Sequence, residues 1–165
     1  MEAQAVLAKD QKVLVFTNEG VKFFKLVESE SRFSLEEDSK FQQYPLAEHV
    51  KFAPYKGHQV SIVDEIGIHL IDMASGQEVT QIVKEGVSAL EYSPLDTYLI
   101  SCEKYSHGKK NLVVWSSHNG KELASFEFKK SSKEGTKSLK FTKDERFCAR
   151  QETPNTISFF DLTTQ

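Results

Sequence analysis

The chain has 165 residues, of which 39% are hydrophobic and 27% are charged, and its formal net charge is −3. This composition is typical of a soluble globular domain and excludes a largely disordered chain. The net charge excludes a globally basic nucleic-acid-binding protein, so any such contact must come from a local patch. No apolar run reaches the roughly 18 residues of a membrane span, and the first residues lack the pattern of a secretory signal. We therefore expect a cytoplasmic protein without membrane contact.

Four apolar, strand-like phrases recur about every 45 residues along the chain. They are VKFFKL, IHLIDM, LVVWSS and ISFFDL, at residues 21–26, 68–73, 112–117 and 157–162. Strand-rich units of roughly 40 to 45 residues are typical of propeller blades. A single unit cannot bury its apolar face, so neighbouring units must stack to form a core. The spacing therefore predicts an interaction scaffold of stacked β modules.

The first unit is a partial copy of this module. Residues 13–16 and 20–24 predict two strands. The stretch over residues 29–39 is polar and acidic, so the last strand of this unit stays an open question.

Two complete units follow, and they align with each other. Each begins with a short strand that ends in aromatic-x-Pro, at Phe52-Ala53-Pro54 and Tyr92-Ser93-Pro94. Proline cannot donate to a sheet ladder, so it ends the strand and begins a turn. Asn-Gly between apolar runs, as at Asn119-Gly120, is a strong hairpin signal because both residues accept positive φ. The further predicted strands are residues 59–63, 68–73 and 78–83 in one unit and 98–102, 112–117 and 122–128 in the other.

A last, incomplete unit predicts the overall architecture. It begins at residue 138 and reaches its third strand at 157–162, three residues before the sequence ends. Closed propellers use four to eight blades, because closure hides the edge strands. We therefore expect an all-β, WD-like β-propeller segment of about three to four four-stranded antiparallel blades that is part of a larger propeller. The alternative is a four-bladed ring that the N-terminal strand closes. The blade units expected are residues 1–47, 48–85, 86–134 and 135–165.

No catalytic or cofactor motif is found in the sequence. Phosphate-binding glycine loops, a nucleophile elbow and a zinc-binding His-Glu-x-x-His motif are all missing. The two cysteines, Cys102 and Cys148, form no Cys-x-x-Cys pair and are expected to be buried free thiols. The five histidines are dispersed, so we expect no metal site, no cofactor, no small-molecule substrate and no enzymatic activity.

Two lysine clusters are the only binding signals. One lies on the connection between the third and last units and contains Lys129, Lys130, Lys133 and Lys137. The other, KYSHGKK, contains Lys109 and Lys110 beside Tyr105, whose ring offers a stacking face. Lysines on a flexible loop neutralise phosphates without reading bases, as contact with ribosomal RNA requires. The plainer interpretation is that both clusters are solvated loops.

The later units also resemble a known family. Asp72-Met73-Ala74-Ser75-Gly76 resembles the WD-repeat pattern, in which an apolar-Asp pair leads into a turn of a small residue and Gly. Trp115-Ser116 and Phe160-Asp161 occupy the positions of that apolar-Asp pair in the next two units. Residues 86–165 are similar to the N-terminal propeller of eukaryotic translation initiation factor 2A. The most telling stretch is KDERFCAR followed by ISFF, because the family has Asp-Glu-x-x-Cys-Ala-Arg before an apolar-x-Phe-Phe strand. The likeness is loose over 50–85 and hardly extends to the first 49 residues, and Phe141 stands where the family has Trp.

The resemblance implies a non-catalytic role in translation initiation. Such a factor would help bind initiator methionyl-tRNA to the small ribosomal subunit and would contact mRNA and other initiation factors. It would not need to bind GTP itself, which agrees with the missing phosphate loop. The family's lysine-rich C-terminal tail is not part of these 165 residues. The alternatives are a WD-like protein–protein adaptor and the propeller subunit of translation initiation factor 3.

Overall fold

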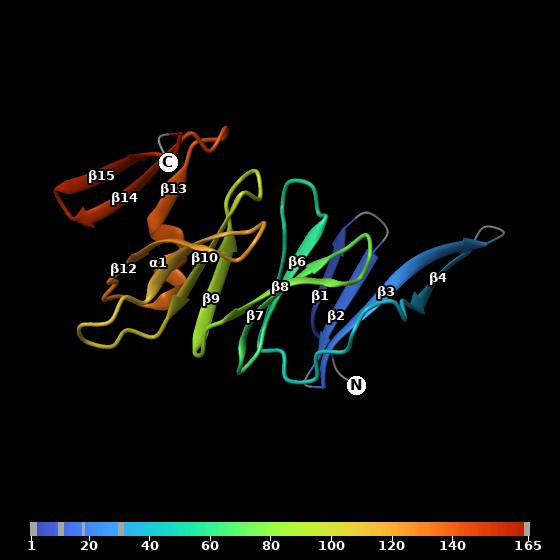
Figure 1. Ribbon diagram of the computed structural model, residues 1–165. Coiled ribbons are helices and arrows are strands. Elements are labelled where there is room, and N and C mark those ends of the chain that lie inside the picture. The colour runs from blue at the N-terminus through green and yellow to red at the C-terminus, as the bar shows by residue number, and fades with distance from the viewer. Residues whose placement is uncertain (1–2, 10–11, 18, 30–31, 164–165) are drawn as a thin grey trace.

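The computed structural model describes residues 3–9, 12–17, 19–29 and 32–163 (Figure 1). They form four small antiparallel sheets that follow one another in chain order. The first sheet contains β1 (Ala3–Lys9), β2 (Lys12–Thr17), β3 (Gly20–Ser29) and β4 (Arg32–Glu37). The second contains β5 (His49–Phe52), β6 (Gln59–Val63), β7 (Gly67–Asp72) and β8 (Glu78–Val83). The third contains β9 (Val87–Tyr92), β10 (Tyr98–Glu103), β11 (Leu112–Ser116) and β12 (Glu122–Phe126). Helix α1 (Ser132–Ser138) then leads into a last sheet of β13 (Leu139–Phe141), β14 (Phe147–Thr153) and β15 (Thr156–Asp161).

The architecture is an open segment of a β-propeller. Within each sheet, every strand pairs with the strand next to it in sequence, which is the up-and-down arrangement of propeller blades. The predicted all-β fold class is therefore confirmed. The alternative of a closed four-bladed ring is wrong, because β1 pairs with β2 in the first sheet and the last sheet contains only β13, β14 and β15.

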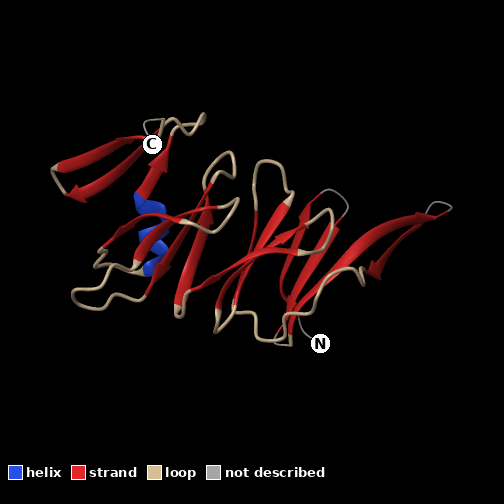
Figure 2. Cartoon of the chain, viewed as in Figure 1, coloured by secondary structure: helices blue, strands red, loops and turns tan. Residues whose placement is uncertain are grey.

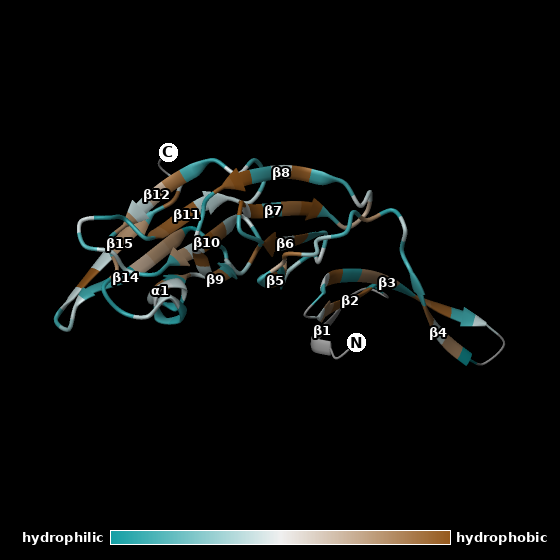
Figure 3. Ribbon diagram, turned by 90° about the horizontal axis from the view of Figure 1, so that it is seen from below, coloured by the Kyte–Doolittle hydropathy of each residue, from teal (hydrophilic) through white to brown (hydrophobic). Residues whose placement is uncertain are grey.

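In the second and third sheets, the first strand lies on one side and the fourth strand on the other. β5 contacts β9, and Figure 3 shows β8 and β12 on the side away from these two strands. Helix α1 packs against β9 and β10. The first-strand side corresponds to the inner side of a propeller and the fourth-strand side to its outer rim.

The same turns recur because the same backbone bonds close them. β5 and β9 end at Phe52 and Tyr92, as the aromatic-x-Pro pattern predicts. In the last three sheets, the N–H of the residue that follows the first strand donates to the C=O of the first residue of the second strand. The pairs are Ala53 with Gln59, Ser93 with Tyr98 and Thr142 with Phe147, each at 3.0 Å.

The turn before the fourth strand is longer than a two-residue hairpin. The N–H of Gly120 donates to the C=O of Ser116 (2.9 Å), and the pairing shifts by one residue between Val114 and Trp115. Of the Asn119-Gly120 pair, only Gly120 takes positive φ, at 68°. The extra residue is absorbed by a bulge rather than by two left-handed residues.

Two buried acidic residues join neighbouring sheets at the turns between first and second strands. Asp96 and Glu145 occupy equivalent turns between first and second strands, and both take positive φ, at 67° and 54°. A carboxylate oxygen of Asp96 accepts the N–H of Lys56 (2.9 Å), and the carboxylate also accepts the N–H of Tyr55, in the preceding sheet. Glu145 in turn accepts the N–H of Leu95. Positive φ is uncommon for residues other than glycine. These two residues therefore adopt a strained backbone conformation, in which their side chains form hydrogen bonds between sheets.

The core lies between the sheets, as Figure 3 shows by the apolar strands at the centre of the row. Leu14 and Phe23 of the first sheet pack with Ile62 and Ile71 of the second. Residues such as Leu70 and Trp115 fill the space between the second and third sheets, and Ile100 packs with Cys148 of the last sheet. Because each cluster draws on two sheets, no single unit has a core of its own.

The structure corrects two expectations about local elements. Strand β1 was not predicted, although its pairing with β2 completes the first sheet. The lysine-rich connection between the third and last units is predicted as a flexible loop, but residues 132–138 form α1. Gly135 lets this helix dock closely, because a Cβ built on it would lie 2.5 Å from Sγ of Cys102. Tertiary packing, rather than local propensity, explains the helix.

Candidate nucleic-acid interface

The structure brings parts of the two lysine clusters to the same end of the third sheet. The connection from β10 to β11 and the connection from β12 to α1 both leave this end, because alternate turns of an antiparallel sheet share a side. Both connections are irregular segments (Figure 2). We call the exposed lysines that they carry the end surface; these are Lys104, Lys109, Lys110, Lys129 and Lys130.

Asn111 holds the two connections together. Its side chain is buried, and its Nδ2 donates to the C=O of Glu103 and to the C=O of Phe128, each at 3.0 Å. The N–H of Phe128 donates back to Oδ1 of Asn111 at 2.8 Å. The hydroxyl of Tyr105 adds a bond to Oε1 of Glu127 (3.0 Å). These bonds fix the backbone from which the lysines project.

The end surface carries more positive than negative charge. Nζ of Lys129 lies 4.0 Å from Oε1 of Glu127, and an exposed ion pair at this distance contributes little to stability. Among the ion pairs of the described residues, none involves Lys104, Lys109, Lys110 or Lys130. Glu127 accepts the hydrogen bond of Tyr105 and so raises the pKa of that phenol, which stays neutral and able to stack. Exposed cations around a neutral ring suit contact with a nucleic-acid backbone.

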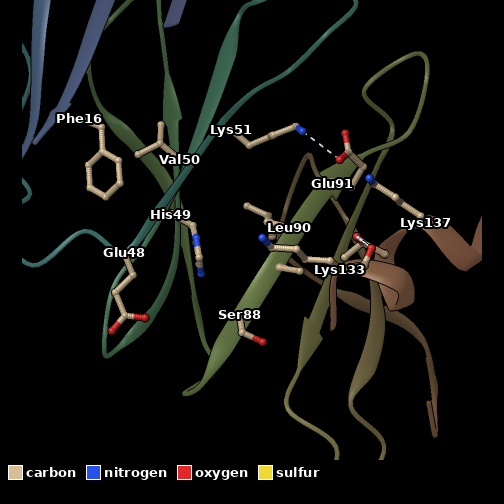
Figure 4. A pocket seen from close by; sticks show the side chains of 12 residues that line it. Phe16, Glu48, His49, Val50, Lys51, Ser88, Leu90, Glu91, Lys133 and Lys137 are labelled. Atoms are coloured by element: carbon tan, nitrogen blue, oxygen red, sulfur yellow. Dashed lines mark hydrogen bonds and ion pairs between the residues drawn. The ribbon is translucent and has the colours of Figure 1, made fainter. Parts of the chain in front are cut away.

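Lys133 and Lys137 lie on a different surface. They project from α1 into an open groove of about 350 Å³ on the first-strand side, which His49 and Lys51 of β5 also line (Figure 4). Nζ of Lys51 is 2.9 Å from Oε2 of Glu91, which lies across the groove on β9. The structure therefore divides the six predicted lysines into four on the end surface and two in a groove of mixed charge.

The cysteines and one histidine, whose side chains are reactive, are buried. Cys102 and Cys148 are buried free thiols, as predicted, and burial raises the pKa of each to about 11. His69 is buried, and its ring nitrogens bond to Glu78 Oε2 (2.7 Å) and Asp64 Oδ2 (2.9 Å). In the described ranges, no group of three or more His, Cys, Asp or Glu side chains is arranged to hold a metal ion.

Comparisons with known proteins show similarity in structure only. No protein-family model matches the sequence, and no curated protein matches it at a significant level. A solved structure described as a eukaryotic initiation factor has a TM-score of 0.78 and 22% sequence identity, over 94% of this chain and 38% of its own. The computationally designed protein Ika4 has a TM-score of 0.59 and 14% identity, over 97% and 91%. Hsv2 of Kluyveromyces lactis has a TM-score of 0.55 and 13% identity, over 94% and 43%.

The chain is a propeller segment. At this level of identity the likeness to an initiation factor shows a shared fold, and this chain spans less than half the length of that protein.

Sequence reasoning missed the roles of two buried polar residues that hydrogen-bond to other parts of the chain. Asn111 stands directly before β11, and a polar residue at the edge of an apolar strand was the only signal for it. His69 lies on β7 between two carboxylates that are distant from each other in sequence.

Among the described helices, none is long and apolar enough to cross a membrane.

Proposed function

We propose that this propeller segment acts in translation initiation as a non-catalytic factor of the 2A type. In this role it helps bind initiator methionyl-tRNA to the small ribosomal subunit in the cytoplasm, with mRNA and other initiation factors as neighbours. The resemblance of residues 86–165 supports the family, and the propeller likeness to a solved initiation factor supports the scaffold.

The observation that carries the proposal is the end surface. Its lysines come from connections about 20 residues apart in sequence and converge through the bonds of Asn111. Lysines on tied connections of a rigid sheet neutralise phosphates at defined positions, as a ribosome-binding scaffold requires. The mixed charge of the groove around Lys133 and Lys137 makes it the weaker of the two candidate surfaces.

Sedimentation of the full chain with purified eukaryotic small ribosomal subunits, with and without labelled initiator methionyl-tRNA, tests the proposal. We expect co-sedimentation that falls steeply with salt, because phosphate contacts release counterions. Lys109→Glu combined with Lys129→Glu should weaken binding by about ten-fold or more and reduce the salt slope.

The matched control changes the same charge at the other end of the sheets. Lys121 and Lys143 are exposed and lie in turns at that end, so Lys121→Glu with Lys143→Glu should leave binding nearly unchanged. A wild-type chain that stays unbound overturns the function. Equal loss in both double variants overturns the assignment to the end surface. Binding that is insensitive to salt would instead favour a protein–protein adaptor.

A further inference from the structure

The outer edge of the second sheet has no strand beside it. β8 is the fourth strand of that sheet, and within the described residues it pairs only with β7. Figure 3 shows β8 on the outer rim of the row. The second sheet already packs against the first sheet and against the third. Further blades of a propeller extend the row at its two ends, so the exposure of this rim does not depend on them.

Backbone groups near the end of β8 point away from its sheet. The N–H of Lys84 donates to the C=O of Ile66 at 3.2 Å. Alternate residues of an antiparallel strand bond to the same neighbour, so Ile82 also faces β7, whereas the N–H and C=O groups of Gln81 and Val83 point outward. Among the described residues, no backbone group bonds to these outward groups. An edge of this kind is a template for a further strand.

Apolar side chains accompany the unpaired edge. Val83 is 75% exposed, and Gln81 lies on the same face of the strand. Ile66, in the turn beside the end of β8, is 50% exposed. Residues 78–83 contain no Pro and no Lys, which commonly protect natural edges from pairing. β12, the corresponding strand of the third sheet, has no large hydrophobic side chain that is exposed. The edge of β8 is therefore the more adhesive of the two.

Acidic side chains flank the apolar end of β8. Glu65 and Glu85 are exposed in the turns beside it. Among the ion pairs of the part of the chain that the structure describes, none involves either of them. Nζ of Lys84 lies 3.1 Å from Oε1 of Glu103 in the third sheet, so that cation is already paired. A partner strand with Lys or Arg beside its apolar residues would complement this flank.

Asp64 holds the flanking turn in place. One of its carboxylate oxygens accepts the N–H of Ile66 (2.9 Å) and the N–H of Gly67 (3.1 Å). The other oxygen lies 2.9 Å from Nε2 of the buried His69. The turn that carries Glu65 is therefore ordered before a partner binds, which lowers the entropy cost of binding.

We propose that the edge of β8 binds an extended segment of a partner protein, which adds a fifth strand to the second sheet. The outward groups of Gln81 and Val83 bond to the backbone of this segment, and the side chain of Val83 packs against its apolar residues. Antiparallel addition places the start of the segment beside Glu65 and Glu85, so Lys or Arg precedes alternating apolar residues in it. The acidic flank disfavours a nucleic acid at this edge.

Amide hydrogen exchange followed by NMR tests the proposal on the full chain. The probe is a synthetic peptide, Lys-Arg-Val-Thr-Val-Thr-Val, at millimolar concentration. We expect it to slow the exchange of the N–H groups of Gln81 and Val83, because these groups gain partners. The same peptide with all its valine and threonine amides N-methylated cannot donate to the edge and should have no effect.

Variants at the apolar position test the contact of side chains. Val83→Asp should raise the dissociation constant of the peptide, measured by chemical-shift titration, by about ten-fold or more. Phe159→Asp is the matched control, because Phe159 is 74% exposed on the last sheet and its change should leave binding unaltered. Circular dichroism checks that both variants stay folded.

Charge reversal tests the acidic flank. Glu65→Lys combined with Glu85→Lys should also weaken binding of the peptide by about ten-fold or more. Glu28→Lys with Glu37→Lys makes the same change of charge at exposed positions of the first sheet and should have little effect.

Three outcomes would each overturn the proposal. In the first, the peptide leaves the exchange of both amides unchanged; in the second, the N-methylated peptide protects them equally. In the third, the two amides become protected in the chain alone as its concentration rises, which would make a second copy the occupant. Lys109→Glu with Lys129→Glu should leave peptide binding unchanged, so this inference and the proposed function fail separately.

Discussion

At the scale of single residues, Asn111 decides how the end surface is built. Its buried amide makes three hydrogen bonds to backbone groups of Glu103 and Phe128. Without this amide, the exposed Tyr105–Glu127 bond would be left as the side-chain link between the two connections. The lysines would keep their charge but lose their defined positions.

We expect Asn111→Ala to lower the free energy of unfolding by about 1–3 kcal/mol, because backbone groups lose buried partners. Urea unfolding measured by circular dichroism checks this value. Asn119→Ala is the control; its Oδ1 accepts one exposed bond from the N–H of Lys121, so its effect should be smaller. Equal stabilities of wild type and Asn111→Ala would show that the amide does not hold the connections.

The two buried thiols should be unreactive in the folded chain. Burial raises the pKa of Cys102 and of Cys148 from 9.0 to about 11, and the thiolate is the reactive form. At pH 8, a thiol-specific chromogenic disulfide should label both cysteines in denaturant and neither within minutes in the folded chain. Since the thiols ionise more readily in the unfolded chain, their stabilising effect is complete below about pH 9 and is lost as pH rises toward 11. Rapid labelling of the folded chain would contradict this burial.

At the scale of elements, the turns that carry Asp96 and Glu145 connect successive sheets. Asp96 takes a strained backbone conformation, and its carboxylate holds the turn of the preceding sheet. Glu145 does the same for the turn that contains Leu95. The third and last sheets are thus each fixed to the preceding sheet by backbone N–H groups that donate to a buried carboxylate, as well as by the apolar core.

We expect Asp96→Gly to destabilise the chain, although glycine relieves the positive φ. The relief is worth roughly 1 kcal/mol, whereas removing the acceptor of the Lys56 N–H costs about 1–3 kcal/mol. Asp96→Asn keeps an oxygen acceptor and tolerates positive φ, so its midpoint in urea should lie between those of the wild type and Asp96→Gly. An Asp96→Gly chain that is more stable than wild type would show that strain outweighs the bonds.

At the scale of the whole molecule, the apolar core lies between neighbouring sheets rather than within them. Leu70→Ala, between the second and third sheets, should therefore lower the free energy of unfolding by about 2–5 kcal/mol. Val83→Ala is the control, because Val83 is 75% exposed and its loss should change stability by less than about 0.5 kcal/mol. Urea unfolding measures both values, and equal stabilities of the two variants would contradict the prediction.

The repeat in the sequence was sufficient to predict the fold class. Alternating apolar strands, the aromatic-x-Pro ends at Phe52 and Tyr92 and the glycine at residue 120 are local signals, and each acts through backbone geometry within a few residues. The sequence did not predict strand β1, because the position of this strand depends on its pairing with β2. Helix α1 escaped as well, since a seven-residue segment with a central Gly135 is stable only when it packs on β10.

The sequence by itself determined the module and the two lysine clusters. Only the tertiary structure decided that Lys109 and Lys129 belong to one surface and Lys133 to another, because that division depends on the bonds of Asn111 and on the docking of α1. It also decided that Phe33 and Phe159 face outward at opposite ends of the row. Pattern fixes which residues share a strand face, but whether that face is covered depends on what lies beside it in space.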